Sequence, residues 1–146
     1  MVLATIDGTG YRIVLIVHIV LMFVAFGALF AVPMLGRAEG SARPVADATA
    51  RYVQRVAVPS LAVAGLLGFA MIGMSDKEFE FKQRWVGIAI LLWLVELAVL
   101  WFGVAATEKK IGAGDAAAEA RRPMFTGISH LLLLVLVYLM VFKPGL

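Results

Sequence analysis

Four long runs of apolar residues, separated by short polar segments, dominate the pattern of this chain. Each run has at least 20 residues and at most one His, Asp, Glu, Lys or Arg. A helix of about 20 residues crosses a hydrocarbon core of about 30 Å, because each residue adds about 1.5 Å. The pattern therefore predicts four membrane-spanning helices, at Ile13 to Gly36, Val56 to Ser75, Trp85 to Thr107 and Pro123 to Phe142.

The segments between the runs are short enough to make consecutive helices antiparallel neighbours. The predicted fold is all-α: a polytopic membrane protein in which residues 1–146 form a single transmembrane domain, an antiparallel four-helix bundle. Lysine and arginine number eight on the side of the first and third connections and five on the other side. The positive-inside rule then places both termini on the extracytoplasmic side of a bacterial inner membrane.

The three connections differ in composition, and each predicts a different local structure. Arg37 to Gln54 is rich in alanine and arginine, which predicts an amphipathic helix on the membrane surface. Asp76 to Arg84 alternates charges with phenylalanines and predicts an interfacial hairpin, whereas Gly-Ala-Gly within Thr107 to Arg122 predicts a mobile connection. Small residues spaced by four in the second run favour close helix packing, inside the bundle or between copies of the chain: Ser60, Ala64 and Gly68.

Composition supports a membrane location and excludes several classes of site. The chain is 62% hydrophobic and 16% charged, whereas soluble domains carry about 25% charged residues. Cysteine is absent, which excludes disulfides, thiolate metal sites, iron–sulfur clusters and covalent c-type haem. Basic residues lie in short loops rather than on a stripe with exposed aromatics, so nucleic-acid binding is not expected.

Three ionisable side chains fall inside the apolar runs. Glu96 is at the midpoint of the third run, and a carboxylate at that depth must face protein, water or a partner group. His130 is roughly 4 Å from the midpoint on the cytoplasmic side, which makes a Glu96–His130 buried polar pair reasonable. His18 is about 10 Å from the midpoint on the outer side, so a single haem ligated by both histidines is disfavoured.

Each of the three groups has more than one reading. Glu96 is a structural hydrogen-bonding group, a proton-relay or ligand-site residue, or a contact to a partner subunit. His130 pairs with Glu96 or with a backbone carbonyl, and His18 is either structural or a haem or metal ligand. Neither a phosphate-binding glycine loop nor an HExxH motif nor paired carboxylates nor a serine–histidine–acid set is evident in the sequence, so a soluble hydrolytic or phosphoryl-transfer active site is not expected.

The pattern of short motifs along the chain resembles a bacterial four-helix membrane superfamily. This superfamily includes HemJ-type protoporphyrinogen oxidases, CopD-like copper-resistance proteins and related membrane proteins of unknown function. The resemblance covers nearly the whole chain and is carried by His18-Ile19, Gly27, Leu29-Phe30, Val58-Pro59, Trp85 and the ending Val141-Phe142-Lys143.

The resemblance implies that His18 binds haem b, as the helix-1 histidine of the HemJ-type enzymes does. Two departures argue against oxidase activity: Ala89 stands where a lysine is expected, and Met124 to Gly127 replaces an Asn-Glu-x-Pro pattern. The resulting hypothesis is a haem- or metal-associated membrane module without catalysis. The alternatives are an accessory subunit of a larger respiratory or photosynthetic complex, and a proton- or small-solute-conducting oligomer that uses Glu96 and His130.

Overall fold

The computed structural model describes residues 8–35 and 42–145, and these residues form helices connected by turns, without a strand. Four helical stretches are long and apolar enough to cross a membrane: Thr9–Phe26, Arg43–Gly73, Arg84–Gly112 and Ala116–Phe142. The elements in chain order are α1 (Thr9–Phe26), α2 (Val32–Leu35), α3 (Ala42–Tyr52), η1 (Val53–Ala57), α4 (Val58–Gly73), α5 (Arg84–Ala98), η2 (Val99–Ala105), α6 (Ala106–Gly112) and α7 (Ala116–Phe142).

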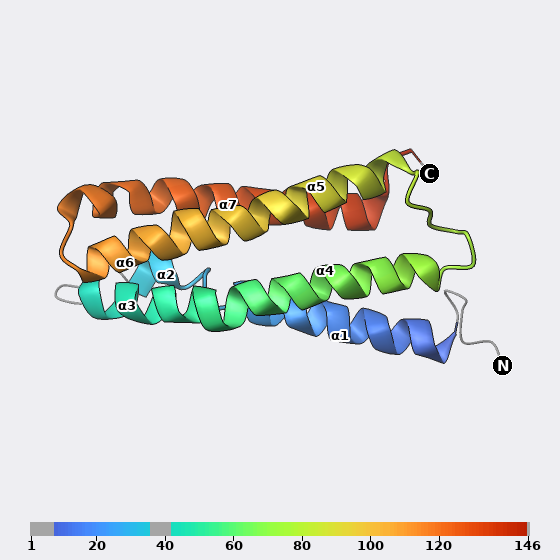
Figure 1. Cartoon of the computed structure of the whole chain (residues 1–146), viewed down its shortest axis with the longest axis horizontal. Helices are drawn as coiled ribbons and strands as arrows, with labels where there is room; N and C mark the ends of the chain where they lie inside the picture. The colour runs from blue at the N-terminus through green and yellow to red at the C-terminus, as the bar shows by residue number, and fades with distance from the viewer. Residues whose placement is uncertain (1–7, 36–41, 146) are drawn as a thin grey trace.

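The long helices lie side by side in two pairs, α1 with α4 and α5 with α7 (Figure 1). At one end α3, α6 and the beginning of α7 pack together around Ala46, Ile111 and Ala118. Toward the other end, which holds the α4–α5 loop, the two pairs diverge (Figure 1). The bundle is therefore closed at its α3–α6 end and open at its α4–α5 end.

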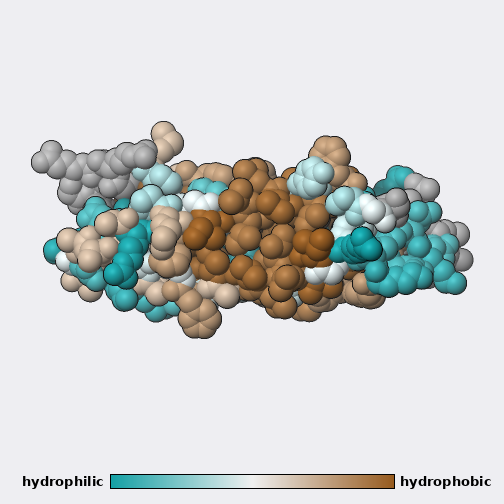
Figure 2. All heavy atoms as spheres, turned by 90° about the horizontal axis from the view of Figure 1, so that it is seen from above, coloured by the Kyte–Doolittle hydropathy of each residue, from teal (hydrophilic) through white to brown (hydrophobic). Residues whose placement is uncertain are grey.

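A broad apolar belt crosses the middle of the face shown in Figure 2, with hydrophilic residues gathered at both ends. Large apolar side chains such as Phe23, Leu131 and Leu134 are mostly exposed on the outside of the bundle. Such a surface suits lipid rather than water. The chain is accordingly an all-helical, multi-pass membrane protein, as its sequence predicts.

The first predicted helix, Ile13 to Gly36, is not continuous in the structure. α1 ends at Phe26 and turns lead to α2, while Gly36 lies outside the described residues. Pro33 explains the break, because its ring clashes with the fourth preceding carbonyl and it has no N–H to donate. The hydroxyl of Tyr52 donates to the carbonyl of Val24 and so caps the end of α1.

The segment predicted to lie on the membrane surface instead prolongs the second membrane helix. α3 continues through η1 into α4, although Arg37 and its neighbours up to residue 41 lie outside the described residues. Pro59 accounts for the π-helical turn, because it cannot supply the regular hydrogen bond to Arg55. The helical stretch Arg43–Gly73 has 31 residues, or about 46 Å, so one end of it extends beyond a core of about 30 Å.

The third and fourth helices also extend beyond the apolar runs that predict them. α6 reaches Gly112, and Asp115 caps α7 by accepting hydrogen bonds from the N–H groups of Ala117 and Ala118. The connection predicted to be mobile is thus mostly helical, and Pro123 lies inside α7 rather than at its first turn.

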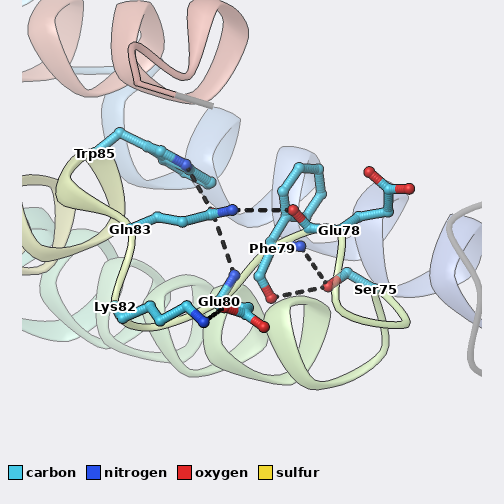
Figure 3. Close-up of polar contacts among 7 residues, drawn as sticks. All are labelled: Ser75, Glu78, Phe79, Glu80, Lys82, Gln83 and Trp85. Atoms are coloured by element: carbon cyan, nitrogen blue, oxygen red, sulfur yellow. Dashed lines mark hydrogen bonds and ion pairs between the residues drawn. The ribbon is translucent and has the colours of Figure 1, made fainter.

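Polar side chains organise the α4–α5 loop, which the sequence analysis expected to be a hairpin (Figure 3). The Ser75 hydroxyl accepts from the N–H of Phe79. The Gln83 side chain accepts from the Trp85 indole and from the N–H of Glu80, and it donates to the carbonyl of Glu78. The Phe79 ring lies edge-on to Trp85 and is covered by the Lys143 ammonium group. The loop therefore packs onto the open end of the bundle.

Candidate functional site

A large apolar cleft lies between the two helix pairs at the open end of the bundle. Its volume is about 660 Å³, within the range of about 300–1,000 Å³ that is usual for small-molecule sites. One wall is formed by α1 and α4, and the other by α5 and α7. Tyr11, His18 and Lys143 carry the hydroxyl and ionisable groups of a lining that is otherwise apolar or aromatic.

His18 is held in one orientation on the wall of this cleft. Its side chain is 7% exposed, and Nδ1 lies 2.8 Å from the backbone oxygen of Ala64 in α4. A carbonyl only accepts, so Nδ1 carries the proton and Nε2 keeps its lone pair. Within the described part of the chain no hydrogen bond reaches Nε2. The imidazole therefore presents a free basic nitrogen in an apolar cleft.

The row of small residues in α4 provides the space for this imidazole. Ala64 is fully buried and supplies the acceptor carbonyl. A Cβ on Gly68 would lie 3.9 Å from Cε1 of His18, in ordinary contact. At these two positions the row packs against α1 inside the bundle. This favours a role of the row in packing within the bundle over a role in contact between copies of the chain.

Trp93 of α5 lines the cleft where α5 contacts α4. Its indole N–H donates to the carbonyl of Leu61 at 2.9 Å. The ring occupies the space that a side chain on Gly65 would need, since a Cβ there would lie 2.2 Å from Cε2 of Trp93. The edge of the Phe69 ring meets the same indole, with 5.6 Å between the ring centroids.

Glu96 lies in the core of the bundle with no exposed surface, as a carboxyl group at mid-depth requires. Its Oε1 accepts a hydrogen bond from the hydroxyl of Ser129 in α7. Its Oε2 has no partner within the described part of the chain. The carboxyl group is therefore satisfied on one side only.

His130 follows Ser129 in α7 but is directed to the break between α1 and α2. Its ring stacks on Phe30 with 4.4 Å between centroids, and it interacts with the backbone of Leu29. Its Nε2 is buried and, among the described residues, unpartnered, as is Oε2 of Glu96. These two atoms therefore do not bond each other, and Ser129 takes the place of His130 as the partner of Glu96.

The two histidines serve different cavities. His18 lines the large cleft, whereas His130 lines a narrow crevice with Thr49, Thr126 and Ser129 that has no room for a water molecule. Among the described residues, no group of three or more His, Asp or Glu side chains could hold a metal ion, so a protein-only metal cage is not formed there.

A buried ion pair near the closed end was not predicted from the sequence. Arg122 of α7 donates through Nε and Nη2 to the two carboxylate oxygens of Glu108 in α6, at 2.9 and 2.7 Å. The Glu108 side chain is 1% exposed and that of Arg122 is 11% exposed. This pair fixes α6 to α7 beyond the apolar runs.

Neither a family model nor a curated protein nor a solved structure matches this chain. The fold and the site define a class, namely a multi-pass helical membrane protein with an apolar cleft lined by a histidine whose Nε2 accepts no hydrogen bond from the described residues.

Proposed function

We propose that this protein is a haem-binding module of the bacterial inner membrane, with haem b held in the large cleft by His18. The observation that carries the proposal is the hydrogen bond from Nδ1 of His18 to the Ala64 carbonyl. Metal-binding histidines usually donate their second ring nitrogen to a carbonyl or carboxylate in this way, which fixes the tautomer and directs the lone pair at the metal.

The tautomer also discriminates among apolar ligands of similar size. A ligand that presents only carbonyl oxygens, such as a quinone, needs a donor, and Nε2 in this tautomer is an acceptor. A metal ion in a large apolar macrocycle needs a lone pair and an apolar enclosure, and the cleft offers both. Tyr11 and Lys143 line the same cleft and supply a hydroxyl and a cation for the haem carboxylates.

The chemistry that haem supplies when bound is one-electron transfer or the binding of small ligands. The residues of the chain hold the haem in place. His18 provides the ligand nitrogen, the Ala64 carbonyl keeps its ring in place, and the Trp93 indole forms part of the apolar lining.

We also propose the orientation that the basic residues favour, with an antiparallel bundle and both termini outside. The closed end then faces the cytoplasm, where it carries Arg43, Arg51, Arg55, Lys109, Lys110, Arg121 and Arg122. The cleft opens toward the extracytoplasmic half of the membrane. Cysteine accessibility tests this directly: Glu119→Cys should react with a membrane-impermeant thiol reagent only after the cells are opened, and Lys82→Cys should react in intact spheroplasts.

Haem binding by His18 is tested with protein purified in a mild detergent and incubated with haem. The wild type should show a Soret band, and His18→Ala should lose at least about tenfold in affinity. His130→Ala is the matched control, since its ring lines a different crevice, and it should keep the band. His18→Gly with added imidazole should regain the band if the loss is one of ligation.

Three results would overturn the proposal. These are a wild type that takes up no haem, an unchanged affinity in His18→Ala, and a band lost equally in His130→Ala. A protein that stays colourless and co-purifies with a large respiratory or photosynthetic complex would favour the accessory-subunit alternative.

A further inference from the structure

The apolar cleft opens sideways, between α1 and α7, to the surroundings of the bundle. α1 packs on α4 and η1, whereas α7 packs on α5, α6 and η2. Of the residues that line the cleft, Phe23 of α1 is 78% exposed and Val141 of α7 is 65% exposed. The rims that these two helices contribute to the cleft are therefore part of the outer surface of the bundle.

Two other sides of the cleft are covered by large side chains. Between α4 and α5, the Phe69 ring meets the Trp93 indole and lies 6.1 Å, centroid to centroid, from the Phe81 ring of the loop. Toward the closed end of the bundle, Phe26 and Leu133 line the cleft and belong to one core cluster. The side between α1 and α7 is accordingly the way into the cleft.

The rim of this opening is apolar, and in a membrane it faces hydrocarbon chains. The exposed side chains of α1, α7 and the turn after α1 that line the cleft are Ile19, Phe23, Phe30, Val137 and Val141. Water finds few hydrogen-bond partners on such walls, so it hydrates them poorly. Apolar contact is non-directional, and a flexible acyl chain follows the walls without any specific geometry. The cleft therefore suits a chain of the surrounding lipid.

The open end of the cleft carries a cation and a hydroxyl group. Lys143, directly after α7, lines the cleft, and its ammonium group lies 4.7 Å from the centre of the Phe79 ring. None of the ion pairs among the described residues includes this ammonium group. Tyr11 lines the same cleft from the beginning of α1, which lies at the same end of the bundle (Figure 1). Both groups donate hydrogen bonds that the phosphate oxygens of a lipid headgroup accept.

We propose that the cleft binds an anionic phospholipid from the leaflet next to the α4–α5 loop. One acyl chain enters between α1 and α7 and lies along the apolar walls, and the phosphate accepts hydrogen bonds from Lys143 and Tyr11. The net negative charge of the headgroup is attracted by Lys143, whereas a zwitterionic headgroup brings a cation of its own. This inference goes beyond haem binding, because it needs no metal ligand; lipid and haem occupy the same cleft in turn.

The proposal is tested by the quenching of tryptophan fluorescence by phospholipids with brominated acyl chains. Of the three tryptophans, Trp93 lines the cleft and Trp101 is 42% exposed outside it. Trp85→Phe/Trp101→Phe keeps the first as the single tryptophan, and Trp85→Phe/Trp93→Phe keeps the second. In phosphatidylcholine vesicles, brominated phosphatidylglycerol should quench Trp93 more strongly than brominated phosphatidylcholine at the same mole fraction. Both lipids should quench Trp101 equally.

Two pairs of variants test the headgroup and the chain separately. Lys143→Gln should lower the preference of Trp93 for the anionic lipid roughly fivefold, which is the attraction of one lysine near a membrane surface. Lys82→Gln is the matched control, since this exposed lysine of the α4–α5 loop does not line the cleft, and it should keep the preference. Gly68→Leu fills part of the cleft and should protect Trp93 from both lipids, whereas Gly73→Leu, in open space on the same helix, should not.

Three results would overturn the lipid site. These are a Trp93 that stays unquenched in vesicles where Trp101 is quenched, equal quenching of Trp93 by the two lipids, and an unchanged preference in Lys143→Gln. If Gly68→Leu fails to fold, the comparison of Lys143→Gln with Lys82→Gln decides alone. No haem is present in these measurements, so their outcome and that of the haem titration of His18 are independent.

Discussion

Glu108→Leu is expected to lower the free energy of unfolding by about 3–5 kcal/mol, because it leaves the Arg122 guanidinium buried without its carboxylate. The two side chains are joined by a bidentate contact of 2.9 and 2.7 Å and are nearly hidden from solvent. For a chain of this size the loss corresponds to a fall in melting temperature of roughly 10 °C. The measurement is the thermal midpoint in detergent, supported by a denaturant titration.

The control for this prediction is the double variant Glu108→Leu/Arg122→Met. Replacing both members of a buried ion pair by apolar residues is often neutral or stabilising, whereas removing one member is not. The double variant should therefore recover most of the lost stability. If Glu108→Leu alone melts at the wild-type temperature, the pair does not hold α6 to α7.

Gly65→Ala is expected to destabilise the bundle by about 1–3 kcal/mol, because the core at this point has no room for a methyl group. The new Cβ would lie 2.2 to 2.5 Å from three atoms of the Trp93 indole. Either the ring leaves its hydrogen bond to Leu61 or α4 moves away from α5. The thermal midpoint and the fluorescence maximum of the purified protein should both change.

A matched control comes from a glycine in open space. A Cβ on Gly127, inside α7, would meet no atom within 4 Å. Gly127→Ala should therefore be neutral or stabilising, by up to about 1 kcal/mol. A second check is Gly65→Ala/Trp93→Leu, which should recover part of the loss because leucine vacates the contested space. Equal melting temperatures for Gly65→Ala and Gly127→Ala would contradict the assigned packing.

The membrane-spanning helices could be predicted because lipid imposes a simple rule on sequence. Apolar runs of 20 or more residues need no knowledge of tertiary contacts, and the structure has a long apolar helix at each run. Helix ends could not be predicted equally well. Hydropathy marks where an apolar run stops, whereas the helices of Arg43–Gly73 and Arg84–Gly112 continue past their apolar runs and pack on each other there.

The candidate site could be predicted in part. Burial of Glu96 follows from its depth, but its partner Ser129 does not, since serine is common in packed helices. The acceptor of His18 is a backbone carbonyl, which no side-chain pattern reveals. The Glu108–Arg122 pair did leave a signal: one residue follows the third apolar run and the other precedes the fourth, at equal height on neighbouring helices.

The two π-helical turns rotate the helical segments that follow them relative to the segments that precede them. A π turn contains one residue more than a regular turn, so the segments before and after it are offset by about 100° around the axis. Deleting one residue from Val53–Ala57 would make that helix regular and rotate α3 away from α6. Ala46 would then leave Ile111, and the closed end would open although every membrane-level residue of α4 kept its place.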